Sequence, residues 1–148
     1  MRPGRRLGVD VGDVRIGVAV CDPSGIIATP LTTVAAGPHA IEELVALTRE
    51  YDVIECVVGL PMSLSGLEGP AAIKVRAYAG QLATTIAPIT VRLFDERMTT
   101  MTADSLLRQG GTAGKKKRAV IDQAAATVIL QTALDTERMR GSAPGETL

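Results

Sequence analysis

Three acidic residues occupy positions in this chain where a carboxylate needs a physical reason. Asp10 and Glu96 each end an apolar run, and Asp122 lies in an Ala-rich stretch. A carboxylate beside a core element is costly unless it is paired or holds a cation. Three such residues, each at the edge of an apolar segment, therefore indicate a metal site that the fold assembles.

Carboxylate oxygens indicate which metal such a site would hold. They suit hard divalent cations, so the expected cofactor is Mg²⁺ or Mn²⁺. Zinc is disfavoured because His39 is the single histidine and the two cysteines, Cys21 and Cys56, form no cluster with it. The lone histidine also argues against a serine hydrolase. Carboxylate-held metal ions are typical of phosphodiester hydrolysis, in which one ion activates water and another stabilises the leaving oxygen.

Each acid also has a simpler explanation. Asp10 could cap a hairpin, and Asp122 could complement a helix dipole from the first turn. The pair Asp95 and Glu96 could be a charged strand end in solvent. Because side chains alternate along a strand, only one of these two can readily face Asp10, and the residues leave that choice open.

Candidate substrate-binding groups lie near two of the acids. Arg97 follows Glu96 and could pair with a carboxylate or contact a phosphate. A basic run predicted to be a loop precedes the last helix; its members are Lys115, Lys116, Lys117 and Arg118. If each neutralised one phosphate of a duplex, the log–log salt slope of binding would gain about −3.6. Such a local patch would offset a formal net charge of zero.

The segments that must position these groups follow from hydrophobic spacing and from Gly and Pro breaks. The predicted strands cover Leu7–Asp13, Arg15–Asp22, Ile26–Val34, Val53–Leu60 and Thr90–Glu96. The predicted helices cover Ala40–Glu50, Ala71–Ile86, a segment from Thr99 or Thr100 to Gln109, and Ala119–Arg138. Pro30 places the third strand at a sheet edge. This order predicts one mixed α/β sheet with helices on both faces.

Length and composition limit the remaining possibilities. The chain has 148 residues with 46% hydrophobic and 2% aromatic side chains. One domain over 7–140 is expected, with flexible ends at 1–6 and 141–148. The few aromatics nearly exclude a platform that stacks nucleic-acid bases. No apolar run approaches the roughly 20 residues of a membrane helix, which favours a cytoplasmic protein without a membrane partner. The two cysteines are expected to be buried thiols.

Four motifs together resemble the YqgF/RuvX family of RNase H-like pre-16S rRNA nucleases and Holliday junction resolvases. They are LGVDVGDVRIGVAV at 7–20, VVGLPMSLSG at 57–66, FDERMTTMTAD at 94–104 and IDQAAATVILQ at 121–131. Each is modest by itself, but four in the right order are specific. The resemblance covers about residues 7–138.

The resemblance implies an RNase H-like fold with a five-stranded sheet of order 3-2-1-4-5. It also implies that Asp10, Glu96 and Asp122 form the catalytic and metal-binding site, and that Arg15, like Arg97, belongs to a family motif that contacts substrate. Many RNase H-like nucleases carry an acid on the fourth strand. Here that strand ends in Gly59-Leu60-Pro61, so Glu96 on the fifth strand would replace that acid.

The resemblance also bears on the cysteines and on one loop. With this strand order, Cys21 and Cys56 would be separated by the first strand, roughly 9.6 Å across two strand spacings. That is too far for an internal disulfide, which leaves a bridge between subunits open. The loop from Gly59 to Gly69 lacks a Walker pattern and either borders the site or is an ordinary mobile loop.

The leading hypothesis is a metal-dependent endonuclease acting on structured nucleic acid, either precursor rRNA or branched DNA. Resolving a junction by two symmetric cuts would require a homodimer, whereas RNA processing would not. One alternative is a non-catalytic nucleic-acid-binding module, such as a transcription factor. Another is a phosphotransferase related to actin and the sugar kinases, although 148 residues leave no room for the second domain that those proteins need.

Overall fold

The protein folds around one six-stranded mixed sheet. The computed structural model describes residues 2–99 and 115–148, and of residues 115–119 it describes the backbone alone. The strands are β1 (Arg6–Val11), β2 (Arg15–Cys21), β3 (Ala28–Ala35), β4 (Glu55–Leu60), β5 (Thr90–Asp95) and β6 (Glu146–Thr147). They lie in the order β3-β2-β1-β4-β5-β6. The predicted order of the first five strands is confirmed, and β6 adds a sixth at the edge.

The sheet changes direction at β1. Strands β1, β2 and β3 are antiparallel neighbours, whereas β4 runs parallel to β1 and β5 runs parallel to β4. As Pro30 predicts, β3 is an edge strand, and the register slips beside this proline so that Leu31 has no partner on β2. The parallel strands β1, β4 and β5 therefore end at a common edge, where Asp10 and Glu96 lie.

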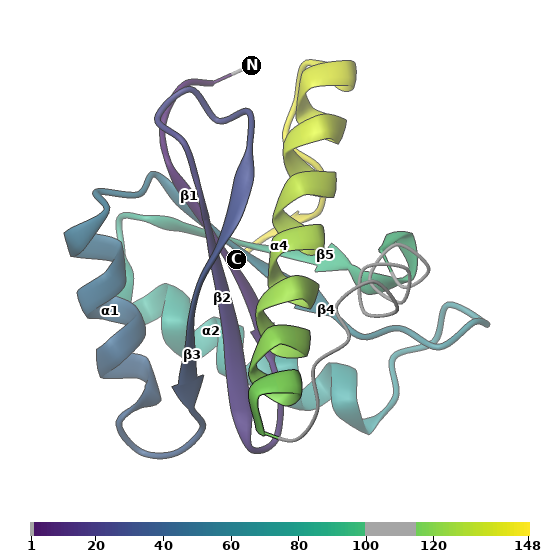
Figure 1. Ribbon diagram of the computed structural model, residues 1–148. Coiled ribbons are helices and arrows are strands. Elements are labelled where there is room, and N and C mark those ends of the chain that lie inside the picture. The colour runs from purple at the N-terminus through teal and green to yellow at the C-terminus, as the bar shows by residue number, and fades with distance from the viewer. Residues whose placement is uncertain (1, 100–114) are drawn as a thin grey trace.

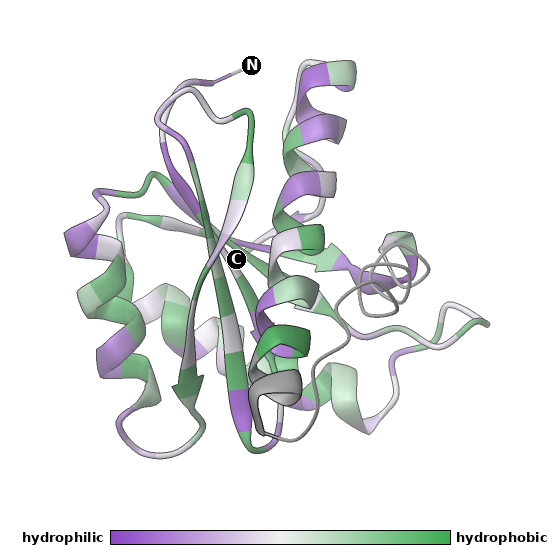
Figure 2. Cartoon of the chain, viewed as in Figure 1, coloured by the Kyte–Doolittle hydropathy of each residue, from purple (hydrophilic) through white to green (hydrophobic). Residues whose placement is uncertain are grey.

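Helices cover both faces of the sheet (Figure 1). They are α1 (Ala40–Glu50), α2 (Pro70–Ile86) and α4 (Lys115–Arg140), with a short 3₁₀ helix η1 (Glu96–Met98) after β5. Helix α4 lies on one face, and α1 and α2 lie on the other (Figure 1). Figure 2 shows apolar residues along the central strands and hydrophilic ones in the last turns of α4. Among the described residues, no helix is both long and apolar enough to cross a membrane.

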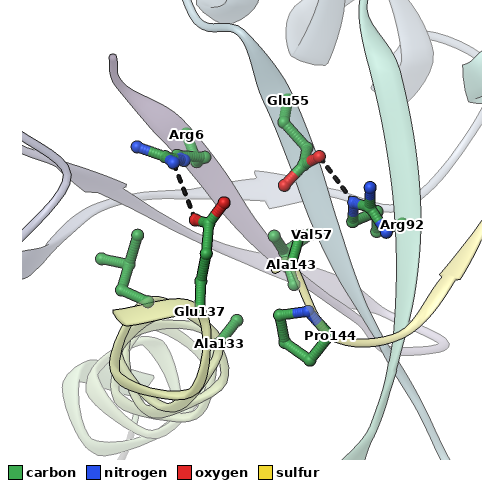
Figure 3. Close-up of a pocket in the computed structure, with 9 residues that line it drawn as sticks. Arg6, Glu55, Val57, Arg92, Ala133, Glu137, Ala143 and Pro144 are labelled. Carbon is green, nitrogen blue, oxygen red and sulfur yellow. Dashed lines mark hydrogen bonds and ion pairs between the residues drawn. The ribbon is translucent and has the colours of Figure 1, made fainter. Parts of the chain in front are cut away.

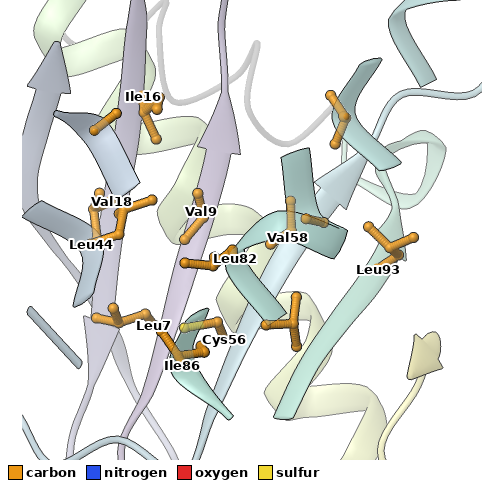
Figure 4. Close-up of a cluster of buried hydrophobic side chains, with 14 of the residues drawn as sticks. Leu7, Val9, Ile16, Val18, Leu44, Cys56, Val58, Leu82, Ile86 and Leu93 are labelled. Atoms are coloured by element: carbon orange, nitrogen blue, oxygen red, sulfur yellow. The ribbon is translucent and has the colours of Figure 1, made fainter. Parts of the chain in front are cut away.

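The larger core lies between the sheet and the pair α1 and α2. Leu7 and Val9 of β1 pack with Leu44 of α1 and Leu82 of α2, as Figure 4 shows. A smaller core lies under α4, where Ile129 and related side chains meet small residues of β2. Aliphatic side chains fill most of both cores, as the low aromatic content predicts, and Phe94 is the aromatic member of the smaller core.

The two cysteines belong to different cores. Cys56 packs in the core of α1 and α2, whereas Cys21 packs under α4. Both are free thiols and both are buried. Their opposite faces exclude an internal disulfide, and their burial also argues against the bridge between subunits that the sequence leaves open.

A buried ion network joins the amino-terminal ends of the strands to the end of α4 (Figure 3). Arg6 bonds to Glu137 at 2.8 Å, and Arg2 also reaches Glu137, at 2.7 Å. Arg92 bonds to Glu55 at 2.7 Å, and Arg2 links the two halves through Glu55 at 3.2 Å. Four of these side chains, Arg6, Glu55, Arg92 and Glu137, help to line a cavity of about 10 Å³, space for roughly one water. The network lies at the opposite ends of β1, β4 and β5 from Asp10 and Glu96.

The carboxyl-terminal tail differs from the flexible segment that its composition predicts. Residues 146–147 form β6, and the Leu148 amide donates to the Val91 carbonyl at 2.9 Å. Gly145 has a φ of +92°, and a Cβ there would lie 2.2 Å from the Leu93 carbonyl oxygen. Pro144 is buried, and Glu146 pairs with Arg76 of α2. Glycine thus allows a close backbone approach that gives β5 a short covering strand.

The basic run also differs from its prediction. Residues Lys115–Arg118 open helix α4 and are not a loop before it. Lysine and arginine are good helix formers, so the run can continue the Ala-rich helix toward its amino end. The predicted helix from Thr99 or Thr100 to Gln109 lies outside the described residues, apart from Thr99.

Candidate metal centre and its neighbours

Asp10 and Glu96 meet at the carboxyl ends of β1 and β5. Asp10 is the penultimate residue of β1, and Glu96 begins η1 directly after β5. Both side chains are half-buried, and their carboxyl groups share a hydrogen bond. Residues 86 positions apart in the chain are therefore brought into contact by the parallel order β1-β4-β5.

The turn after β5 decides which acid faces Asp10. The Asp95 carboxylate accepts a hydrogen bond from the Arg97 amide at 2.9 Å and caps η1. It also binds the Arg97 guanidinium, with 2.5 Å between Oδ2 and Nη2. Asp95 is thus occupied locally, and Glu96 is the acid that reaches Asp10. Alternation along the strand left this choice open, and it was the family resemblance that favoured Glu96.

Glycines beneath α4 bring Asp122 close to the same edge. Gly17 is the register partner of Asp10, and a Cβ at position 17 would lie 1.9 Å from the Asp122 carbonyl oxygen. At Gly59 of β4, a Cβ would lie 2.6 Å from Glu96 Oε1. A larger residue at position 17 would therefore collide with the backbone of α4, and one at position 59 would collide with the Glu96 carboxyl group.

The pKa values of Asp10 and Glu96 are both raised in the folded protein. Burial raises the pKa of Asp10, the hydrogen bond from Glu96 lowers it, and the nearby charge of Asp122 raises it, with a net upward shift. Burial, the hydrogen bond with Asp10 and its charge together raise the pKa of Glu96 to about 8. Near neutral pH the protonated Glu96 can thus donate to the Asp10 carboxylate. Two acids that share a proton offer a position where a cation could replace it.

Asp122 lies near this pair and is held by Arg15. The Arg15 Nε donates to Asp122 Oδ2 at 2.8 Å, joining the start of β2 to α4. Within the described residues, no three acids, cysteines or histidines are close enough to hold an ion together. The donor set fits Mg²⁺ or Mn²⁺ in its chemistry, with Asp10 and Glu96 in contact and Asp122 adjacent.

The other expected substrate contacts lie around this edge. Arg97 is exposed and bound to Asp95. Lys115, Lys116, Lys117 and Arg118 lie one to two helical turns before Asp122, and their side chains are outside the description. In the Gly59–Gly69 loop, the Ser63 hydroxyl donates to the Leu67 carbonyl at 2.9 Å. This hydrogen bond closes a turn, so the loop has an internal structure.

Sequence reasoning missed a second feature of this edge. A cavity of about 210 Å³ lies beside Glu96, between the β1–β2 hairpin and the start of α2. Lys74 of α2 forms an ion pair with Asp13 of the hairpin at this cavity. Sequence position gives no hint of the pair, because the two residues are 61 positions apart. A lysine on a polar helix face looks like any solvated charge.

Comparison with known proteins gives a family and close relatives. The model of the RuvX family, described as Holliday junction resolvase, matches residues 4–136. A Streptomyces avermitilis protein named "Putative pre-16S rRNA nuclease" is 62% identical over 99% of this chain and 95% of its own length. A Streptomyces coelicolor protein of the same name is 61% identical over 99% of this chain and 89% of its own.

Solved structures show the same fold in a distant protein. The RuvC of T. thermophilus in complex with a Holliday junction substrate superimposes with a TM-score of 0.57. The superposition covers 97% of this chain and 99% of that one, at 16% sequence identity. A second T. thermophilus RuvC structure gives a TM-score of 0.55 at 15% identity. At this level of identity the similarity concerns the fold, which is the RNase H-like sheet that the family resemblance implies.

Proposed function

Since the chain belongs to the RuvX family, we propose that it is a metal-dependent nuclease that hydrolyses phosphodiester bonds in structured nucleic acid. One observation carries the proposal: Asp10 and Glu96 are in contact at the carboxyl edge of the sheet, with Asp122 beside them. Ligands in open α/β sheets gather at this edge. Membership of the family does not by itself place the acids next to each other, so their contact in the structure is a separate argument for the proposal.

Asp10, Glu96 and Asp122 are the residues proposed to hold Mg²⁺ or Mn²⁺. The bound cation would supply an activated water and charge stabilisation at the leaving oxygen. Glu96 would lose to the solvent the proton that it shares with Asp10. Arg15 would orient the Asp122 carboxylate through the bond at 2.8 Å. Arg97 and the basic start of α4 would contact the substrate backbone.

Two substrates fit this chemistry, and both are phosphodiesters. Precursor rRNA is the first candidate, because the relatives at 62% and 61% identity are named for it. Branched DNA is the second, because the family description names a Holliday junction resolvase. Cutting a junction symmetrically would need two copies of the site, so a homodimer belongs to this second candidate. Either function would take place in the cytoplasm.

A side-by-side cleavage assay tests the proposal. Purified protein is incubated with a precursor 16S rRNA fragment and with a four-way DNA junction, each with Mg²⁺, with Mn²⁺ and with EDTA. We expect metal-dependent cleavage of one substrate, with products that EDTA abolishes. Binding without cleavage under all conditions would instead support a non-catalytic nucleic-acid module.

The variant Asp10→Asn tests the role of the acid pair. It should reduce cleavage by at least about a hundredfold, since it removes a charge at the point where the cation is proposed to bind. Circular dichroism should match the unmodified protein, because asparagine keeps the shape and can still accept the hydrogen bond from Glu96. The melting temperature should not fall, since the raised pKa of Asp10 means that its charge does not stabilise the fold. Full activity of Asp10→Asn on the same substrate would refute the mechanism. Exposed Glu43→Gln on α1 is the matched control and should cleave normally.

A further inference from the structure

A cavity lies beside the acid pair, and Glu96 is the member of the pair that lines it. Its lining comes from the hairpin at Val11–Asp13, from Pro61 and from the first turns of α2 around Lys74. Its volume is about 210 Å³, against roughly 30 Å³ for one water in the liquid. The cavity thus has space for a tetrahedral anion together with several waters, and Glu96 is the group that it shares with the candidate metal centre.

Of the described residues that line this cavity, Lys74 is the one with a cationic side chain. Its ammonium group donates to the Asp13 carboxylate, so the pair links α2 to the β1–β2 hairpin. The two side chains are 65% and 83% exposed. An ion pair with this much solvent around it contributes little to stability, so Lys74 can exchange its partner easily.

Among the described side chains, three cations near this edge are bound to acids, and their partners differ in exposure. The partner of Arg15 is 21% exposed, the partner of Arg97 is 33% exposed, and the partner of Lys74 is 83% exposed. A more exposed carboxylate is more strongly hydrated when it is released. Of these three cations, Lys74 is therefore the one that an incoming anion can take over most readily.

We propose that Lys74 binds a backbone phosphate next to the scissile one, in the cavity beside Glu96. Asp13 holds the ammonium group at the cavity until the substrate phosphate replaces it. Lysine suits this role because it acts as a point charge on phosphate oxygens and needs no fixed fork geometry. The inference rests on the proposed nuclease function and adds a positioning residue that lies outside the three acids and the basic start of α4.

Binding measurements on the Asp10→Asn protein test the proposal without cleavage. The probes are a fluorescein-labelled precursor 16S rRNA fragment and a labelled four-way DNA junction, titrated at several KCl concentrations. Lys74→Gln should weaken binding about tenfold, because one charge-assisted contact is lost. It should also reduce the log–log salt slope by about 0.7 to 0.9, since one phosphate is no longer neutralised.

Asp13→Asn separates this role from a merely structural one. If Asp13 competes with phosphate for Lys74, the substitution should tighten binding, by up to about fivefold. If the ion pair only ties the hairpin to α2, Asp13→Asn and Lys74→Gln should weaken binding alike, which would overturn the proposal. Thermal unfolding of both variants checks that they fold, as expected for exposed side chains.

Matched controls remove the effect of overall charge. Arg49→Gln and Glu43→Gln make the same charge changes on exposed positions of α1, outside the cavity. If Lys74→Gln binds the probes as tightly as Arg49→Gln does, the proposed role of Lys74 is wrong. The proposed nuclease function would not be affected by that result. If the Asp10→Asn protein binds neither probe and the unmodified protein cleaves neither substrate, the proposed nuclease function is wrong. The role assigned to Lys74 would then be wrong as well.

Discussion

Gly17 and Asp122 show how residue size positions the candidate metal centre. A Cβ at position 17 would meet the Asp122 carbonyl oxygen at 1.9 Å, and a Cβ at Gly8 would meet the Ala126 carbonyl oxygen at 2.7 Å. These neighbours are helix backbone, which cannot rotate aside as a side chain can. Glycine at these positions therefore sets how near α4, and with it Asp122, comes to Asp10.

Gly17→Ala should disturb both folding and catalysis. The added methyl group must push α4 away from β2, so the free energy of unfolding should fall by about 1–3 kcal/mol. Cleavage should fall as well, because Asp122 moves with the helix. Urea unfolding and the cleavage assay measure the two effects.

Gly80→Ala on α2 is the control for this change. A Cβ there would meet nothing within 4 Å, and alanine inside a helix is more stable than glycine by about 0.5–1 kcal/mol. Gly80→Ala should thus raise the urea midpoint while Gly17→Ala lowers it. Unchanged stability of Gly17→Ala would contradict the close packing of α4 on β2.

At the scale of elements, α4 connects two charged centres at opposite ends of the sheet. Asp122 near its start lies beside Asp10, and Glu137 lies 15 positions later, roughly 22 Å along the helix. Glu137 bonds to the buried Arg6 guanidinium, which is 1% exposed. The ion network thus fixes the far end of the helix whose near end carries a proposed metal ligand.

The pH dependence of stability tests this anchoring. Burial by itself would raise the pKa of Glu137, but bonds from Arg2 and Arg6 outweigh it and lower the pKa below its usual value. The unfolded chain then binds this proton more readily than the folded one. The contribution of Glu137 is therefore complete above pH ~4.3, the usual pKa of glutamate, and is lost as pH falls through the folded-state pKa.

Thermal unfolding between pH 7 and pH 3 measures that contribution. Glu137→Gln should be less stable by about 3–5 kcal/mol at pH 7, since the buried Arg6 guanidinium loses the negative charge opposite it and keeps its bonds to the Gly4 and Arg2 carbonyls. Its deficit should shrink as the pH falls below ~4.3, because the unfolded form of the unmodified protein takes up this proton before the folded form does. A deficit that stays constant across this range would show that the charge of Glu137 is not what stabilises the fold. Glu43→Gln, which is exposed, should follow the unmodified protein throughout.

At the scale of the whole molecule, the hydrophobic pattern of the sequence predicts single helices and strands, but not the contacts between distant segments. Helix α1 has the bounds that its apolar spacing predicts, because one face of it packs on the core. The strand order was supplied by the family resemblance. The pairs Asp10–Glu96 and Arg15–Asp122 depend on crossovers and on a 3₁₀ turn, which periodicity does not encode. A strand of two residues, such as β6, is too short to show any period.

The tail gives a test at this scale. Removing residues 144–148 deletes β6, the buried Pro144 and Glu146, one of the two acids that pair with Arg76. The free energy of unfolding should fall by about 1–3 kcal/mol, and the uncovered edge of β5 should favour association at high concentration. Urea unfolding and light scattering measure the two changes.

Two variants separate the parts of the tail. Gly145→Ala should mimic the deletion, because its φ of +92° and the Leu93 carbonyl at 2.2 Å leave no room for a methyl group. Glu146→Gln removes only an exposed ion pair and should change stability by less than about 0.5 kcal/mol. A deletion as stable as the full chain would mean that the tail is not part of the fold.

Because the two buried cysteines lie on opposite faces of the sheet, each can report on the opening of its own face. Burial raises the pKa of Cys56 to about 12 and also raises the pKa of Cys21. Each thiol is therefore nearly unreactive toward alkylating reagents until its own layer opens and lets in water. Cys21 reports the lifting of α4 from the sheet, and Cys56 reports the release of α1 and α2. Alkylation rates under native conditions thus measure how often each face opens, and whether the helix that carries Asp122 separates from the sheet without global unfolding.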